Sequence, residues 1–261
     1  MQTQPFSLAA SAEMLYLELD FVDRVNRIHE LGFLVEIWNW KNKDLAKLAA
    51  TGASFQSMTG YLEGDLIDQS GIDRLMATAL ESIEASKVIN CQNLNLHGTG
   101  LDANGQAIKK KLEVSESDWS TAQDTLARIA ELGVKHNRVF TLENLNTKVD
   151  HPGTPFASSK DTLALVSGVN SPGLRMNLDL YHAQIDEGNL TEILQLCLPW
   201  VGEIQVADVP GRMEPGTGEI NYPFLARKLF EFGYNGVIGL EGWASADSDS
   251  ALEAFRGAFT L

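Results

Sequence analysis

RVFTLEN at residues 138–144 and LRMNLDL at residues 174–180 are short, largely apolar segments, each with an acidic residue near its carboxyl end. A longer stretch separates them. Short apolar runs alternating with longer amphipathic stretches are typical of parallel strands joined by crossover helices. The same alternation extends outward in both directions. The other candidate strands are FSLAAS (6–11), FLVEIW (33–38), SFQSM (54–58), VINCQNLNLH (88–97), EIQVAD (203–208) and GVIGLEG (236–242).

The stretches between these strands have the apolar period and the end signals of helices. Residues 20–32 and 43–52 each close on a glycine, and residues 117–133 open with a Ser-Asp cap and close on Gly133. Eight strand-helix units in 261 residues predict an α/β protein with a single (β/α)₈ TIM-barrel domain over residues 1–261. A doubly wound open sheet would accept the same alternation, but the placement of polar residues favours the barrel.

Composition narrows the class of protein. The hydrophobic fraction is 44% and mean hydropathy is -0.10, and no run approaches the ~18 apolar residues of a membrane helix. The first fifteen residues lack the basic start and apolar run of a secretion signal, so a cytoplasmic location is expected. Cys91 and Cys197 are too few for a disulfide framework and are interpreted as buried thiols.

The acidic balance bears on partners. A formal charge of -15 repels phosphate backbones and anionic lipid, so neither a nucleic acid nor a membrane partner is expected. An anionic substrate would need a local cation, either a metal ion or a placed arginine. GTG at 98–100 and at 216–218 lacks the spacing of a nucleotide-binding loop, so no nucleotide or redox cofactor is predicted. The sequence does not determine the oligomeric state, and a homo-oligomer is compatible with it.

Four polar side chains stand near the ends of four consecutive candidate strands. They are Glu143, Asp179, Gln205 and Glu241. In a barrel the carboxyl ends of the strands meet at one face, where reactive groups belong. Three acidic groups in one mouth require a counter-charge, and oxygen ligands suit Mg²⁺ or Mn²⁺ better than zinc. The alternative is a set of separate structural carboxylates, and Gln205 has the stronger claim to a plain structural role.

Four further residues are candidates for substrate contact. His182 follows Asp179 closely enough to reach the same mouth, and Arg212, in a Gly- and Pro-rich loop, could hold a substrate carboxylate. His97 and Glu36 end the fourth and second candidate strands. For each of the four, an ordinary structural contact is the alternative.

The C-terminal half resembles the hydroxypyruvate isomerase family, which belongs to the xylose-isomerase-like TIM barrels. TLENLN, NLDLYHAQIDEGNLTEIL, EIQVADVPGRMEPGTGEINYPFL and GYNGVIGLEGW occur in order and carry the resemblance, and the N-terminal half is similar only in layout. The resemblance implies that Glu143 and Glu241 are the catalytic proton donor and acceptor, and that both ligate a metal with Asp179 and Gln205. It makes His182 and Arg212 substrate contacts.

This chain departs from the family pattern in the segments that are expected to bind the substrate. It reads VEIWNWKNKD after the second strand, SMTGYLEGDL after the third, and Gly242-Trp243-Ala244 after the last glutamate. The resemblance therefore implies the reaction type more directly than the substrate.

The function expected is a divalent-metal-assisted isomerase acting on a small hydroxy-keto acid. The preferred reaction is hydroxypyruvate to tartronate semialdehyde, by enediolate proton transfer between the two glutamates. The alternatives are a 2-oxo-tetronate isomerase or a ketose 3-epimerase with the same metal site, or more distantly a non-catalytic sugar- or acid-binding barrel. His is usual in the epimerases where this chain has Gln205, which favours the isomerase. A nuclease on this barrel would need a basic face and more than five His.

Overall fold

The computed structural model describes residues 4–261, and its strands form one closed parallel barrel. The order is β1-β2-β3-β4-β5-β6-β7-β8, with β1 pairing to β8 through Ala10 and Leu240 among others. The predicted (β/α)₈ barrel is therefore confirmed. The strands are β1 (Ser7–Ser11), β2 (Leu34–Glu36), β3 (Phe55–Thr59), β4 (Asn93–Leu96), β5 (Val139–Glu143), β6 (Leu174–Asp179), β7 (Val201–Val206) and β8 (Val237–Leu240).

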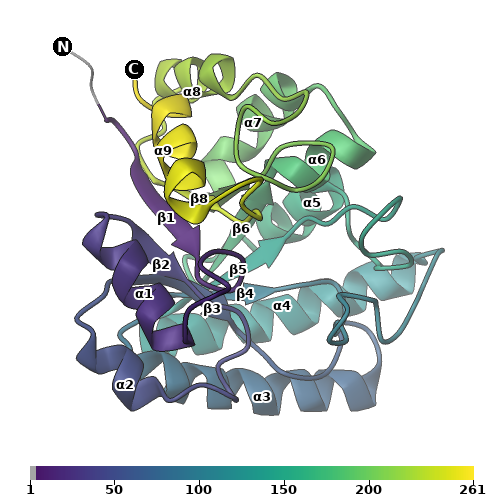
Figure 1. Ribbon diagram of the computed structural model, residues 1–261. Coiled ribbons are helices and arrows are strands. Elements are labelled where there is room, and N and C mark those ends of the chain that lie inside the picture. The colour runs from purple at the N-terminus through teal and green to yellow at the C-terminus, as the bar shows by residue number, and fades with distance from the viewer. Residues whose placement is uncertain (1–3) are drawn as a thin grey trace.

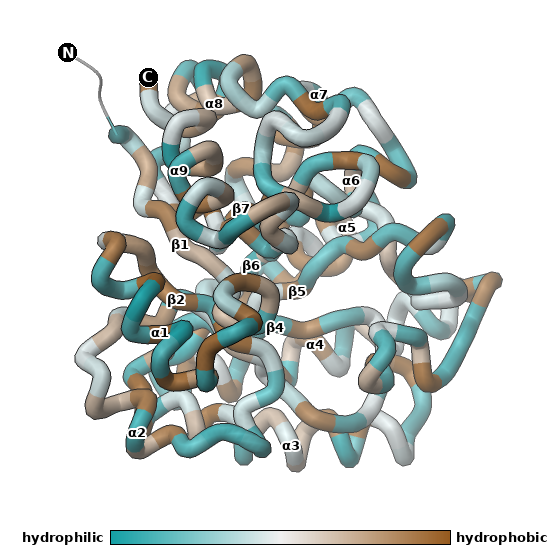
Figure 2. The backbone as a smooth tube through the Cα atoms, viewed as in Figure 1, coloured by the Kyte–Doolittle hydropathy of each residue, from teal (hydrophilic) through white to brown (hydrophobic). Residues whose placement is uncertain are grey.

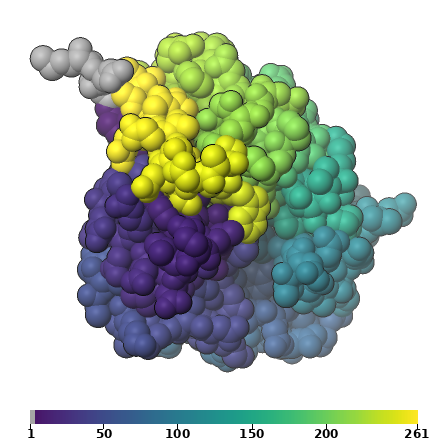
Figure 3. All heavy atoms as spheres, in the orientation of Figure 1, coloured from purple at the N-terminus to yellow at the C-terminus, as the bar shows by residue number. Residues whose placement is uncertain are grey.

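Helices surround these strands (Figure 1). They are α1 (Phe21–Glu30), α2 (Leu45–Ala50), α3 (Gln69–Val88), α4 (Glu116–His136), α5 (Ser159–Val169), α6 (Leu180–Asp186), α7 (Leu190–Cys197), η1 (Leu198–Trp200), α8 (Tyr222–Glu231) and α9 (Ser248–Ala258). Hydrophilic and hydrophobic residues alternate along the outer helices (Figure 2), as expected for helices with one buried face. The C-terminal segment packs against the N-terminal one and closes the ring (Figure 3).

Two sequence-based boundaries were wrong. The predicted strand at 88–97 begins only at Asn93, because α3 runs to Val88 and a turn follows in which Cys91 N donates to Ser86 O at 2.9 Å. Helix α4 does not end at Gly133 but continues to His136. A Cβ at Gly133 would meet backbone oxygens 2.8 Å away, so glycine at this position lets the helix pack closely against neighbouring backbone.

The N-cap of the same helix lies two residues before its predicted Ser-Asp cap. Ser115 is the N-cap and forms a reciprocal capping box with Asp118. At the other end, Asn137 adopts a left-handed conformation (φ 54°) and closes the helix. The helix is therefore fixed at both ends by residues that lie just outside the predicted range.

Large apolar side chains fill the space between strands and helices. Phe140, Leu142, Met176 and Ile204 are fully buried. Each such side chain contributes ~1.5–3 kcal/mol through removal of apolar surface from water. This packing holds the strands in register and so fixes the polar residues that end them. Within residues 4–261, no helix combines the length and the apolar character that crossing a bilayer requires.

Candidate active site at the carboxyl ends of the strands

The four predicted metal ligands lie at the ends of neighbouring strands. Glu143 and Asp179 are the last residues of β5 and β6. Gln205 lies one residue before the end of β7, and Glu241 directly follows β8. Asp179 is paired with Gln205 in the β6–β7 register. All four are 6% exposed or less, so the barrel gathers them into one buried polar region.

Asp179 also caps helix α6, and this cap brings His182 into the region. The Asp179 Oδ1 atom accepts a hydrogen bond from His182 N at 2.9 Å. His182 Nε2 lies 3.7 Å from both Asp179 Oδ2 and Glu143 Oε1. Ligand atoms of these three residues lie within 4.8 Å of one another, which is close enough to hold a metal ion.

The hydrogen bonds of Asn146 determine which nitrogen of His182 carries the proton. Asn146 Oδ1 accepts from the backbone N–H groups of Val149 and Asp150, so its Nδ2 faces His182 Nδ1 at 2.7 Å. An amide nitrogen can only donate, and therefore Nδ1 accepts. Burial holds the pKa of His182 well below its usual value, so the ring is neutral and its proton lies on Nε2. That N–H has no hydrogen-bond partner among residues 4–261 and faces the two carboxylates.

Two neutral side chains contact the Glu143 carboxyl. Asn95 Nδ2 donates to its Oε2 atom, and His97 Nε2 lies 3.1 Å from the same atom. Burial is the first cause that raises the pKa of Glu143 to about 8, and the negative charge of Glu241 is the second. Without a cation, Glu143 is therefore a carboxyl that holds its proton near neutral pH.

The neighbours of His97 agree with that protonation. Tyr61 donates its single O–H to the carbonyl of Thr99 at 2.9 Å, so its contact with His97 Nδ1, also 2.9 Å, requires the histidine to donate. Burial lowers the pKa of His97 to about 4, which leaves Nε2 without a proton at neutral pH. That nitrogen then accepts from a protonated Glu143, and His97 is placed directly against a predicted catalytic residue.

Both ends of the Gln205 amide are engaged inside the barrel. Asn177 Nδ2 donates to Gln205 Oε1 at 2.6 Å, while Gln205 Nε2 donates to Glu36 Oε2 at 2.9 Å. Glu36 is 2% exposed, and its Oε1 atom would lie only 2.0 Å from a Cβ at Gly239. Burial first, and the nearby Glu203 second, raise the pKa of Glu36 well above its usual value. Glu36 thus contacts Gln205 within the barrel and fixes the direction of its amide.

Glu241 has the opposite environment to Glu143. Arg212 Nη2 donates to Glu241 Oε2, and the indole nitrogen of Trp38 donates to Oε1 at 2.7 Å. The guanidinium group of Arg212 also lies 5.1 Å from the centre of the Tyr181 ring. Of the two side chains that donate to the Glu241 carboxylate, one is thus positively charged. Arg212 is therefore paired with Glu241 at the end of β8.

The loop that carries Arg212 is held by a buried carboxylate that sequence reasoning did not select. Asp208 is fully buried, and its Oδ1 accepts from the N–H groups of Val209 and Ile220. Its Oδ2 accepts from Gly216 N at 2.8 Å. These bonds fold the loop back on itself and position Arg212. The segment VADVPG gave a signal, since an acidic residue directly after a strand often organises the following turn.

Other contacts missed from the sequence are amides. Asn95 lies two residues before the predicted His97 on β4 and its extension, so both face Glu143, and the pattern NLNLH contained that information. Asn146, which orients His182, lies in a loop where no periodic pattern exists. Of the eight predicted site residues, the structure brings Glu143, Asp179 and His182 together, sets His97 against Glu143, and pairs Arg212 with Glu241 and Glu36 with Gln205.

The donor set suits a hard divalent cation. Burial raises the pKa of Asp179, with the charge of Glu143 as the second cause, and Glu143 itself is raised in the same way. Crowded carboxylates of this kind are stabilised by a bound cation. The carboxylates of this group offer oxygen atoms, which hard divalent cations prefer. The free N–H of His182 is a donor for an oxygen atom, which separates its role from that of the carboxylates.

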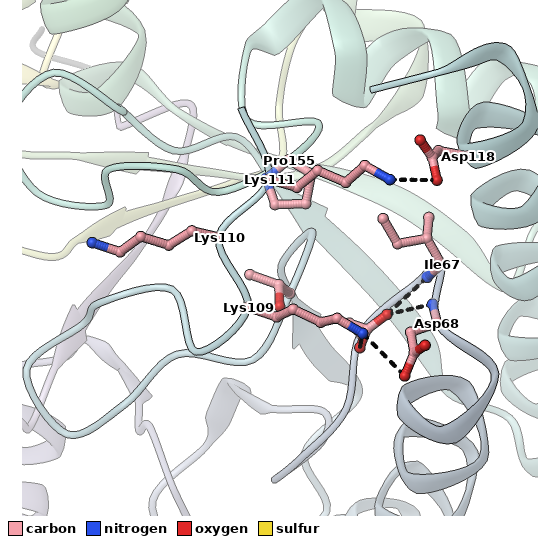
Figure 4. A pocket seen from close by; sticks show the side chains of 9 residues that line it. Ile67, Asp68, Lys109, Lys110, Lys111, Asp118 and Pro155 are labelled. Carbon is pink, nitrogen blue, oxygen red and sulfur yellow. Dashed lines mark hydrogen bonds and ion pairs between the residues drawn. The ribbon is translucent and has the colours of Figure 1, made fainter. Parts of the chain in front are cut away.

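Apart from this buried polar region, a cavity of about 170 Å³ lined by charged side chains lies between the loops after β3 and β4. Figure 4 shows Lys109 reaching Asp68 and Lys111 reaching Asp118, whereas Lys110 points away. The two ion pairs measure 3.0 and 2.7 Å. Their charges are already paired, and none of the eight predicted site residues lines this cavity.

Comparison with known proteins identifies the family. The family model described as xylose isomerase-like TIM barrel matches residues 6–258. The 2-oxo-tetronate isomerase of Pectobacterium atrosepticum is 31% identical over 89% of this chain and 90% of that protein. The hydroxypyruvate isomerase of Escherichia coli is 35% identical, over 53% of each chain. The chain belongs to the xylose isomerase-like TIM barrel family.

Its relatives also give the class of enzyme. Both proteins above are named as isomerases, and this chain is an isomerase similar to hydroxypyruvate isomerase. The crystal structure of an AP endonuclease, family 2, from Brucella melitensis has a TM-score of 0.84 and covers 96% of this chain and 98% of that one. At 24% identity that likeness shows the shared fold.

Proposed function

We propose that this protein is a divalent-metal-assisted isomerase that interconverts a small hydroxy-keto acid and its aldehyde isomer, with hydroxypyruvate and tartronate semialdehyde as the preferred pair. The observation that carries the proposal is the convergence of Glu143 and Glu241 from β5 and β8 onto one buried region, in unlike environments. Two carboxyl groups that differ in this way suit proton removal and proton return.

Glu143, Asp179, Gln205 and Glu241 would hold the metal ion. When bound, Mg²⁺ or Mn²⁺ neutralises the carboxylates and polarises the carbonyl and hydroxyl oxygens of the substrate. The raised pKa values of Glu143 and Asp179 support this assignment, because among residues 4–261 neither group forms an ion pair with a Lys or Arg, and a cation would supply that charge. The assignment of Gln205 is supported by Glu36, which accepts from the amide nitrogen and so fixes the direction of the amide. The amide oxygen accepts from Asn177 and has a second lone pair that a metal ion would use.

The glutamates, His182 and Arg212 would have separate roles in the reaction. One glutamate removes a proton from the hydroxymethyl carbon of hydroxypyruvate, and an enediolate forms. That glutamate or its partner then returns a proton to the adjacent carbon, while the hydroxyl proton moves from the oxygen of the first carbon to that of the second. Atoms and charge then balance without a redox cofactor. The free Nε2–H of His182 is placed to donate to a substrate oxygen. Arg212 supplies the positive charge that a substrate carboxylate requires in a chain of charge -15.

A 2-oxo-tetronate is the second candidate substrate. The relative named for that activity matches 90% of its own length, compared with about half for the Escherichia coli hydroxypyruvate isomerase. The same proton transfer would serve a substrate with one more hydroxylated carbon. The loop after β2, where this chain departs from the family pattern, is the region expected to distinguish the two acids.

The test is proton exchange with solvent. The protein with Mn²⁺ or Mg²⁺ is incubated in D₂O with hydroxypyruvate, a 2-oxo-tetronate and a ketose in separate samples, and deuterium incorporation and product formation are followed by NMR. Deuterium in a hydroxy-keto acid, lost on chelation of the metal, is the expected result. Labelling of the ketose alone would favour an epimerase. Absence of exchange in every sample would contradict the proposed function.

A further inference from the structure

Trp38 is a large apolar residue that remains 40% exposed in the loop after β2. Its indole nitrogen nevertheless makes a 2.7 Å hydrogen bond to Glu241 Oε1, across 203 residues of sequence. A tryptophan with one exposed face and its single donor committed to a buried carboxylate does more than fill space. The bond links the loop after β2 to the residue that follows β8.

The backbone at Trp38 is fixed on both sides, so the position of the indole is determined by the fold. Trp38 N donates to Glu13 Oε1 at 3.0 Å, and its carbonyl accepts from Thr59 N at 3.5 Å. Glu13 is itself paired with Lys43 Nζ at 2.6 Å. Contacts from the loop after β1 and from β3 therefore aim the N–H of Trp38 at Glu241.

The two oxygens of Glu241 have partners of different kinds. Arg212 occupies Oε2 and Trp38 occupies Oε1. On the proposed function, Arg212 turns toward the carboxylate of the substrate and weakens its bond to Glu241. Trp38 carries no charge to attract that carboxylate, and its backbone anchors hold it in place. Its hydrogen bond is then the contact that keeps Glu241 oriented during the reaction.

We infer that Trp38 is a positioning residue, whose indole N–H holds the Glu241 carboxylate in the orientation needed for metal binding and proton transfer. This inference rests on the proposed function. Loss of an outer partner of a metal ligand typically costs 10–100-fold in metal affinity or activity.

Three variants separate this role from plain packing. W38F keeps an aromatic ring and removes the N–H. W38H returns an N–H at the same number of bonds from Cβ. W40F is the matched control, because Trp40 lies in the same loop and also donates one indole hydrogen bond, at 3.0 Å, but to Ser82 on α3. The full-length variants are measured for Mn²⁺ affinity by isothermal titration calorimetry, for kcat and KM on the acid that the wild-type protein turns over, and for melting temperature.

W38F is expected to weaken Mn²⁺ binding or lower kcat by 10–100-fold with KM changed less than kcat, W38H to recover part of the loss, and W40F to match the wild type in both. Equal behaviour of W38F and W40F beside an active wild type would overturn the inference and leave the proposed function intact. Equal loss in W38F and W38H would also overturn it, since bulk rather than the N–H would then matter. A wild-type protein without Mn²⁺ binding or turnover would contradict the proposed function itself.

Discussion

The two halves of the barrel contribute different things to the site. Strands β5 to β8 end in the groups assigned to metal binding and proton transfer, namely Glu143, Asp179, Gln205 and Glu241. Strands β2 and β4 and the segments after them supply the neighbours that orient these groups, namely Glu36, Trp38, Asn95 and His97. The residues assigned to the chemistry therefore lie in the second half, and the first half contributes neighbours that orient them. Changes in the first half should alter rates and substrate preference while leaving the reaction type intact.

The largest effect is expected from the proton-transfer residues of the second half. E143Q or E241Q keeps the size of each side chain and removes its ability to exchange a proton, so kcat should fall about 10²–10⁴-fold. Steady-state turnover of the hydroxy-keto acid measures the loss, and circular dichroism checks that the barrel is intact. Full turnover in either variant would show that its glutamate does not carry the proton.

Asp179 tests metal binding in the same half. D179N leaves one amide oxygen that can accept from His182 N, so the cap of α6 survives, while the negative ligand is lost. Mn²⁺ affinity should fall by more than the 10–100-fold typical of an outer neighbour. Calorimetric titration measures it, and an unchanged melting temperature of the metal-free protein is the control. Unchanged affinity would remove Asp179 from the ligand set.

A smaller effect is expected from the first half. N95A removes the amide donor to Glu143 without touching the carboxyl itself. Because the donor only orients Glu143, the expected loss in kcat is about 10–100-fold, with the reaction type unchanged. Comparison with E143Q under the same conditions is decisive. A loss as large as that of E143Q would break the distinction between the two halves.

The smallest effect is expected far from the mouth, at the capping box of α4. S115A should destabilise the protein by about 1 kcal/mol with no change in kcat, which a urea titration and an activity assay measure.

Lys111 first, and Ser115 next, lower the pKa of Asp118 from 3.8 to about 2. Its stabilising contribution is thus present above pH 3.8 and is lost as the pH falls toward 2. D118N should be less stable than the wild type at pH 7, and the difference should shrink over that acid range.

The fold could be read from the sequence because each unit repeats the same local signals. RVFTLEN and LRMNLDL have the length and apolar content of buried parallel strands, and glycines follow α1 and α2 as their ends require. The predictions went wrong where tertiary packing overrides those signals. A glycine such as Gly133 predicts a helix end. It lies instead within α4, at a position where the backbone of a neighbouring segment passes too close for a Cβ. No local pattern records that contact.

For the site too, some features could be predicted from the sequence and others could not. The positions of Glu143, Asp179, Gln205 and Glu241 follow from the topology, since the carboxyl ends of parallel strands must meet. Their partners do not follow, because the bond from Trp38 to Glu241 and that from Gln205 to Glu36 span 203 and 169 residues. Amide orientation and histidine tautomer depend on such three-dimensional contacts, so a sequence can nominate reactive residues but leaves their protonation states open.

The most direct test of the central claim is the crystal structure of the protein soaked with Mn²⁺, with the ion located by its anomalous scattering. The account predicts one ion bound through oxygen atoms of Glu143, Asp179, Gln205 and Glu241, with His182 Nε2 outside the coordination sphere and free to donate to substrate. An ion held by Glu143, Asp179 and His182 without Gln205 and Glu241, or no ion at the mouth, would contradict it.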